Sequence, residues 1–350
     1  MKRGLVLLDP QEIPPVELTT RVTELQGSMR QKGVAACFIY GDVNHSGDIT
    51  YLCNLSIYWN EALLAVPLTA SPALLTKLSS RVHPWMRSIS NLTDLRSGPN
   101  LADLASAYLT GMPPGIVGLV EMDWWPAHVV NEMREKLPGW DFMDLGPLVQ
   151  EERRRPSESE LLLLREGCRI SATAVATGMN TALTNKERAG QAELAARMAG
   201  VEDVFVFCHP ATPEADTVEV LSEYRGYWTL AARVVCTAAP QWMPVLEQAY
   251  RAAVLQLRSG ANVLKVRDAV KGAIKDGNLT WRADLIHHTD LETGGDFRLP
   301  SEESRPFETG SVAALRLAFQ FADGTFGVIA DTFRIDADGA QRLTSAIPGV

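Results

Sequence analysis

Histidine suits proton transfer near neutral pH, and His209, His287 and His288 are the candidates among the six histidines. His209 follows a short apolar run, and the His287-His288 pair precedes Asp290 and Glu292. Adjacent residues of a strand face opposite sides, so one member of the pair can enter a site, where a carboxylate could orient its ring. We expect His209 and His288 to act in catalysis and His287 to contact substrate. A loop histidine with a backbone partner and a polar turn are the alternatives.

Two glutamates and an arginine complete the candidate charged groups. Glu219 and Glu223 are four residues apart in a strand-like segment, which places both on one face. We assign Glu219 to catalysis and Glu223 to substrate binding; a solvated or salt-bridged face is the alternative. Arg316 interrupts an apolar strand, where a cation without a partner would be costly. It either pairs with Glu219 or binds a substrate carboxylate or phosphate with two hydrogen bonds.

The sequence lacks the motifs of the common cofactors. It contains no G-x-G-x-x-G or Walker-type loop, no G-x-S-x-G and no C-x-x-C spacing. Cys208 adjoins His209, but neighbouring residues of a strand point to opposite sides. The pair is therefore weak evidence for a cysteine nucleophile activated by histidine. The five cysteines are scattered and mostly in apolar contexts, which is typical of reduced thiols in a cytoplasm. We therefore expect no cofactor.

Composition excludes several classes of partner. The 350 residues carry a net charge of -9 and no long basic run, so nothing attracts nucleic acid or an anionic membrane. The basic cluster 153–155 is flanked by acids and a proline, which favours a linker. There is no run of about 18 apolar residues, and the apolar stretch at the N-terminus is too short for a signal peptide. The expectation is a cytoplasmic protein that acts on a small molecule.

Strands and helices alternate in the first part of the chain. Apolar periodicity predicts helices over 19–33, 101–109 and 125–137, and short apolar runs predict strands over 34–40, 63–68, 73–75 and 116–120. A charged, proline-containing stretch near 148–157 then marks a boundary, giving domains 1–150 and 151–350. Helices are predicted over 160–183, 186–200, 241–258 and 263–275, and strands over 204–208, 218–224, 227–237 and much of 281–350. The fold class is α/β followed by α+β.

Four stretches, in order, resemble the creatinase/Xaa-Pro aminopeptidase family. They are Ile49-Thr50-Tyr51-Leu52 with 62–67; Pro156-Ser157-Glu158-Ser159-Glu160 with 164–172; Tyr224-Arg225-Gly226-Tyr227 with Arg233; and Gly310-Ser311-Val312 with 327–344. The resemblance implies an RNase-H-like N-terminal domain and a C-terminal pita-bread domain. It also implies a homodimer.

The resemblance further implies five ligands for a pair of divalent ions, and here this sequence departs from the family. The two aspartate positions hold Glu219 and Leu230, and the two glutamate positions hold Arg316 and Ala330. The histidine position falls on 287 or 288. Aliphatic side chains cannot ligate, and a guanidinium repels a dication. We therefore expect no metal pair, although a shift of register by one would let a carboxylate such as Glu223 hold a single ion.

Three further roles follow from the resemblance. His209 is similar to the acid/base of creatinase, and Tyr227 matches the tyrosine of the family's Gly-Tyr pair, for which we expect substrate contact. The loop with Trp59 and Glu61 resembles the part that closes over the partner's site, with packing between domains as the alternative. The glutamate that holds the guanidinium in creatinase is matched by Ala232, so creatine itself is not expected.

These features predict a metal-independent, creatinase-like hydrolase or lyase that acts on a small C–N or amide-type substrate with an anionic group. Two alternatives stay open. One is a catalytically dead pita-bread protein kept as a binding module. The other is a Xaa-Pro aminopeptidase or dipeptidase with altered metal ligands.

Overall fold

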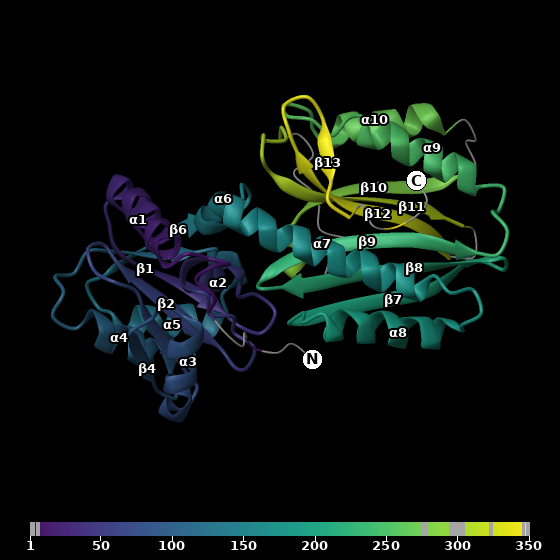
Figure 1. Cartoon of the computed structure of the whole chain (residues 1–350). Coiled ribbons are helices and arrows are strands. Elements are labelled where there is room, and N and C mark those ends of the chain that lie inside the picture. Colours follow the sequence, from purple (N-terminus) through teal and green to yellow (C-terminus); the bar gives the residue numbers. More distant parts are fainter. Residues whose placement is uncertain are drawn as a thin grey trace. The chain divides into compact units, whose positions relative to one another are not determined.

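The chain divides into two compact units, and the division falls between Arg153 and Arg154. The computed structural model describes Gly4, residues 8–274, 279–293, 305–321 and 325–344, and Ile347. Each unit buries hydrophobic cores of its own (Figure 1). The predicted fold class is confirmed: a mixed α/β unit precedes a unit built on an antiparallel sheet with helices.

The N-terminal unit contains a mixed six-stranded sheet with the order β4-β3-β2-β1-β5-β6. Its strands are β1 (Val34–Gly41), β2 (Ala62–Pro67), β3 (Ala73–Thr76), β4 (Asp94–Ser97), β5 (Ile116–Val120) and β6 (Asp141–Gly146). β1 pairs antiparallel with β2 and parallel with β5. β4 and β6, which sequence reasoning missed, are edge strands with few apolar residues, so they lack the signal of a buried run.

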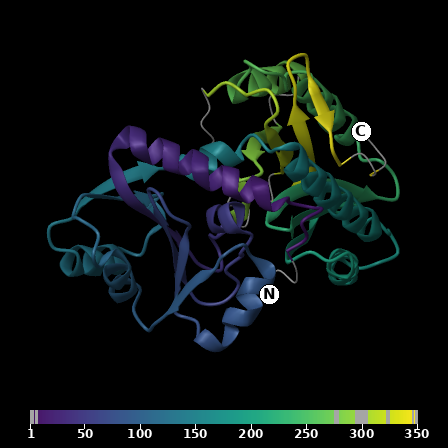
Figure 2. The same cartoon turned by 60° about the vertical axis from the view of Figure 1, so that its left-hand side comes forward.

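Helices cover both faces of this sheet. The helical segments are α1 (Pro15–Lys32), α2 (Gly47–Cys53), η1 (Ser80–Val82), α3 (His83–Ile89), α4 (Leu101–Leu109), η2 (Met122–Trp124), α5 (Ala127–Lys136) and α6 (Leu148–Arg153). Apolar residues of α1, α2 and α3 pack on one face, and those of α4 and α5 pack on the other (Figure 2). α1 begins four residues before its predicted start because proline is tolerated in a first helical turn.

The C-terminal unit repeats one arrangement twice. Each half has two helices followed by three antiparallel strands, and the path runs β10-β11-β12-β9-β8-β7, with β13 on β12. The first half is α7 (Glu158–Gly178), α8 (Asn185–Met198), β7 (Asp203–Thr212), β8 (Ala215–Tyr224) and β9 (Tyr227–Cys236). The second is α9 (Met243–Val254), α10 (Val263–Ala273), β10 (Thr280–His287), β11 (Val312–Gln320) and β12 (Phe326–Ile335), with η3 (Asp290–Thr293) and β13 (Ala340–Arg342).

Threonine side chains join the two halves where the ladder between β9 and β12 is short. Ala232 and Ala330 form the registered pair between these strands. The Thr332 hydroxyl accepts from the Leu230 amide and donates to the Leu230 carbonyl, each over 3.0 Å. The Thr217 hydroxyl donates to the Phe326 carbonyl over 3.2 Å. These bonds satisfy backbone groups that a regular ladder would have paired.

The four helices of the C-terminal unit lie on one side of its sheet. α7 and α8 pack on β7–β9, and α9 and α10 pack on β10–β12 (Figure 1). Strand residues of the opposite parity form a separate apolar cluster without these helices. We call this side the inner face. Its buried members on the described strands include Leu221, Trp228, Leu230, Ala232, Ala314, Ala318, Val328 and Ala330.

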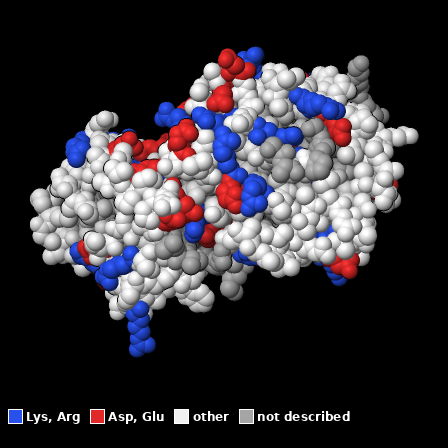
Figure 3. Space-filling view, in the orientation of Figure 1, with Lys and Arg blue, Asp and Glu red and all other residues white. Residues whose placement is uncertain are grey.

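Surface charge is mixed in sign. On the face drawn in Figure 3, Lys and Arg are interspersed with Asp and Glu in each unit, and wide areas carry neither. Among the helices that the structure describes, none combines the length and the apolar character needed to cross a bilayer.

Candidate functional site

A row of aligned residues crosses the inner face. Arg316 on β11 is opposite Ala330 on β12, Ala330 is opposite Ala232 on β9, and Ala232 is opposite Glu219 on β8. Arg316 and Glu219 therefore occupy equivalent places in the two halves, each one strand outward from the central alanine pair. Side chains in one row share one face of a sheet, so the two charged groups can meet only by crossing the alanines.

Arg316 and Glu219 do meet, in a bidentate ion pair. Arg316 Nε donates to Glu219 Oε1 over 2.7 Å, and Nη2 donates to Oε2 over 3.1 Å. The residues are 6% and 2% exposed. The methyl groups of Ala232 and Ala330 leave the space that the two long side chains occupy. Of the two alternatives for Arg316, internal pairing with Glu219 is the one observed, and its Nε and Nη2 donors are directed at that carboxylate.

His209 lies on β7 two residues beyond Phe207, which is the residue opposite Glu219. It belongs to β7, which continues to Thr212, so the alternative of a loop histidine does not hold for its position. The backbone partner that this alternative named is present, because Nδ1 is 3.4 Å from the Pro210 carbonyl oxygen. Its ring is 4.1 Å from that of Phe326, and the Arg316 guanidinium is 5.8 Å from the same ring. Burial lowers the pKa of His209 below its ordinary value; Glu219 opposes this shift and Arg316 adds to it. The Nε2 atom is buried and has no hydrogen-bond partner among the described residues.

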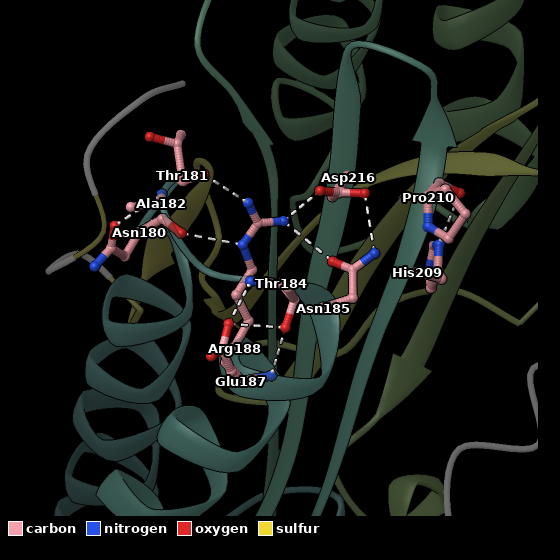
Figure 4. A network of polar contacts seen from close by, with 10 residues as sticks. All are labelled: Asn180, Thr181, Ala182, Thr184, Asn185, Glu187, Arg188, His209, Pro210 and Asp216. Atoms are coloured by element: carbon pink, nitrogen blue, oxygen red, sulfur yellow. Dashed lines mark hydrogen bonds and ion pairs between the residues drawn. The ribbon is translucent and has the colours of Figure 1, made fainter.

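A polar network fixes the strand that pairs with this part of β7. Arg188 on α8 forms an ion pair with Asp216 on β8, and its Nε donates to the Asn180 carbonyl over 3.1 Å. Asn185 donates to Asp216 over 3.0 Å. Figure 4 shows this network beside the segment of β7 that carries His209. Asp216 lies directly opposite Pro210, so the α7–α8 connection holds the neighbourhood of His209 in place.

The other histidines are not next to His209. β10 and β7 are the two outermost strands of the path, with four strands between them, and His287 ends β10. His287 is opposite Ala313, which belongs to the helix-side core, so alternation directs His288 toward the inner face. His288 is buried, and its ring is 6.2 Å from that of Tyr227.

Glu223 is buried and opposite Trp228, on the same face as Glu219, as the four-residue spacing predicts. Tyr227 donates its hydroxyl proton to Glu160 of α7 over 2.9 Å, so this hydroxyl serves a structural contact. That contact differs from the substrate contact expected for Tyr227.

Trp59 and Glu61 belong to the N-terminal unit. Trp59 is 63% exposed. Glu61 accepts from the Tyr40 hydroxyl over 2.7 Å and pairs with Lys77. The carboxylate therefore anchors its own loop to β1, and Trp59 stays available for contact.

Two polar residues of the inner face were not identified as candidate site residues in the sequence analysis. Asp284 lies on β10 opposite Arg316, and Trp228 lies on β9 opposite Glu223. Asp284 Oδ2 and Trp228 Nε1 are buried polar atoms without a hydrogen-bond partner in the described part of the chain. A carboxylate between Ala283 and Leu285 in a strand is the signal that could have identified Asp284, because a charge in an apolar strand needs a reason.

The residues that the resemblance matches to the family's metal positions do not have the side chains or the surroundings to hold a pair of divalent ions. Glu219 is bound by a guanidinium, and Leu230 and Ala330 are fully buried in the apolar cluster of the inner face. Asp331, adjacent to Ala330, is committed on the helix side to Arg233 and Tyr250. Within the described ranges, no three His, Cys, Asp or Glu side chains gather in a group that could hold an ion.

Comparisons with known proteins agree with this architecture. Residues 21–154 match the Creatinase/Prolidase N-terminal domain family. A search of curated proteins found no match.

Three solved structures illustrate the likeness of the whole chain. The prolidase from Pyrococcus horikoshii OT3 is 16% identical, with a TM-score of 0.77 over 93% of this chain and 98% of that one. The X-Pro aminopeptidase from Thermotoga maritima MSB8 is 14% identical, with a TM-score of 0.79 over 93% and 98%. The Xaa-Pro dipeptidase from Bacillus anthracis is 13% identical, with a TM-score of 0.78 over 95% and 99%. The N-terminal unit of this chain is thus a creatinase/prolidase N-terminal domain, and the chain as a whole has the pita-bread architecture of the prolidases and Xaa-Pro aminopeptidases.

Proposed function

We propose that this chain is a hydrolase or lyase of small C–N or amide-type substrates that works by acid/base chemistry at His209, without a metal pair. The observation that carries the proposal is the imidazole of His209 itself. It is on the inner face, its pKa is lowered, and its Nε2 is buried without a partner beside the Glu219–Arg316 pair. A neutral imidazole at pH 7 can accept a proton and later return it.

In hydrolysis, His209 Nε2 accepts a proton from water as the water oxygen bonds to the substrate carbon. The C–N bond then breaks, and the same proton passes to the leaving nitrogen. The Glu219–Arg316 pair supplies a fixed dipole that need not reorganise during these steps. His288 and His287 have no step here, because their strand is at the other edge of the sheet. The expected anionic group of the substrate has no assigned partner either, since Arg316 holds Glu219.

The test is His209→Gln, which keeps a polar side chain but cannot carry the proton. Turnover of a panel of small amides, ureas and amidines should fall by about 10²–10⁴-fold. The unfolding midpoint should change little. His128→Gln, at an exposed position on α5, is the matched control and should keep full activity. Equal turnover by His209→Gln and the parent protein would overturn the proposal.

If the chain were instead a Xaa-Pro aminopeptidase or dipeptidase with altered metal ligands, its activity should depend on metal. Added Mn²⁺ would then release the N-terminal residue from X-Pro peptides, and a chelator would abolish that release. Under our proposal neither addition changes turnover. Metal-dependent cleavage of X-Pro peptides would therefore contradict us.

A second candidate, a binding module without chemistry, is favoured by one observation. Aliphatic residues make up much of the centre of the inner face, and the Arg316 guanidinium there is bound to the Glu219 carboxylate. Such a module would bind a small molecule with no turnover in any variant. Ligand binding without product formation by the parent protein would select this candidate.

A further inference from the structure

The edge strand β7 carries two exposed phenylalanines on the inner face. Phe207 is directly opposite Glu219 and Phe205 is opposite Leu221, so each shares the face of its partner on β8. Phe205 is 38% exposed and Phe207 is 41% exposed, whereas Leu221 and Glu219 are buried. In these rows the inner face is therefore covered on β8 and accessible on β7.

The packing of β7 uses only its other face. The alternate residues Val204, Val206 and Cys208 pack in the core with α7 and α8. An antiparallel strand with one face on a core usually carries polar residues on the second face, and an edge strand needs them most. Two large apolar side chains that are neighbours on such a face, rather than scattered singly, are typical of a binding surface.

His209 continues the same series of alternate residues along β7. The ladder with β8 is regular from Asp203 to Pro210, so Phe205, Phe207 and His209 follow one another on one face. A strand rises about 3.3 Å per residue, which puts the Cα atoms of Phe207 and His209 about 7 Å apart. A molecule that places its C–N bond at the His209 imidazole can thus lay a neighbouring substituent on the Phe207 ring.

The chemistry of this surface favours an apolar ring as that substituent. Phe205 stacks on the buried Trp228 of β9, with ring centroids 5.8 Å apart and an interplanar angle of 17°, so its position is fixed by packing. The Glu219 carboxylate opposite Phe207 is neutralised by Arg316. Aromatic faces that remain accessible gain from stacking with a further ring.

We propose that Phe205 and Phe207 bind an apolar ring of the substrate and thereby determine the specificity of the His209 site. The inference rests on the proposed function in one respect, namely that the bound molecule is the substrate on which His209 acts. It narrows the substrate class to amides and related C–N compounds with an apolar ring next to the scissile bond.

Phenylacetamide and acetamide test the proposal, since they share the amide and differ by the ring. Calorimetry with the full chain measures their dissociation constants. We expect phenylacetamide to bind at least about tenfold more tightly, because its ring leaves water. In NMR spectra it should also shift the imidazole C–H resonance of His209, which is assigned by its loss in His209→Gln.

Phe207→Ser should abolish the preference for phenylacetamide and, because the ring is exposed, leave the unfolding temperature nearly unchanged. Leu255→Ser, at a 75% exposed position next to α9, removes an exposed apolar side chain elsewhere in the same unit and should retain the preference. In turnover, Phe207→Ser should raise KM for ring-bearing amides with kcat little changed, whereas His209→Gln should lower kcat.

Equal binding of the two probes by the parent protein would overturn the inference, and so would an unchanged preference in Phe207→Ser. A second copy of the chain is the other possible occupant of this surface. A dimer that Phe207→Ser converts to a monomer in analytical ultracentrifugation, with the same probe preference in both states, would therefore count against us.

The catalytic proposal fails separately. If His209→Gln keeps turnover, the acid/base role is lost, while the comparison of the two probes still decides the role of Phe205 and Phe207. A preference for phenylacetamide that persists in His209→Gln and disappears in Phe207→Ser would support the inference.

Discussion

The Glu219–Arg316 pair is the residue-scale feature on which the site depends. Both groups are removed from water, and their attraction offsets that cost only when geometry is good and the donors are used. The two parallel N–H to oxygen bonds meet this condition. A guanidinium suits this place better than an ammonium because its fork matches a carboxylate.

Removing one partner of the ion pair should therefore destabilise the protein strongly. Arg316→Met leaves the Glu219 carboxylate buried and uncompensated, and we expect it to lower the free energy of unfolding by about 3–5 kcal/mol. Urea unfolding measures the change. Arg169→Met, which breaks the exposed Arg169–Glu166 pair, is the control and should cost less than about 1 kcal/mol.

The double variant Arg316→Met/Glu219→Leu separates charge from packing. It removes both charges, so much of the lost stability should return. If the loss of unfolding free energy in the double variant equals the sum of the losses in the two single variants, the ion pair does not cause the destabilisation.

At the scale of elements, small residues on the two central strands make the pairing possible. Ala232 on β9 and Ala330 on β12 are fully buried between the charged groups. A larger side chain at either place would occupy the path of Arg316. β9 and β12 thus allow the ion pair to form in two ways: their register aligns Arg316 with Glu219, and their small alanine side chains leave room between the two charged groups.

Ala330→Leu tests this reading. The added atoms should displace the Arg316 side chain and overpack the centre, at a cost of about 1–3 kcal/mol. Thermal unfolding checks the loss. Ala127→Leu, at an exposed position of α5, should leave the unfolding temperature nearly unchanged. A stable Ala330→Leu protein with the ion pair intact would show that the alanines are not needed.

At the scale of the whole molecule, two acids of the N-terminal unit make the stability of the protein depend on pH. In the N-terminal unit, burial raises the pKa of Glu152 to about 7, and the charges of Glu24 and Asp48 add to the shift. Burial also raises the pKa of Asp48 to about 6, although Arg153 pairs with it over 2.7 Å. Both groups bind protons more tightly in the folded than in the unfolded state. Their contribution is full below the unfolded pKa and is lost as pH rises through about 6 to 7.

Glu152→Gln should remove part of this pH dependence. Glutamine stays neutral, so at pH 8 the variant should unfold about 2–4 °C above the parent protein, equivalent to about 1 kcal/mol. At pH 5 the difference should shrink, because Glu152 is then protonated in the folded state. Differential scanning calorimetry at both pH values measures it. The exposed Glu135→Gln is the control, and a variant less stable than the parent at pH 8 would refute the assignment.

The sequence alone determined the elements with strong periodicity and the alternation that places Glu219 and Glu223 on one face. α4 and β5 have the predicted bounds, because their apolar runs end at turn or capping residues. Local pattern also identified His209 and Arg316 as unusual.

Tertiary structure alone decided which charges meet. Glu219 and Arg316 are 97 residues apart, and the row that aligns them exists only after two halves of a sheet join at Ala232 and Ala330. The same joining paired Arg316 with Glu219 and placed His209 and His287 on opposite edge strands of the sheet. The physical reason is that strand register and side-chain burial are set by long-range pairing, whereas sequence periodicity reports only the local preference of each segment.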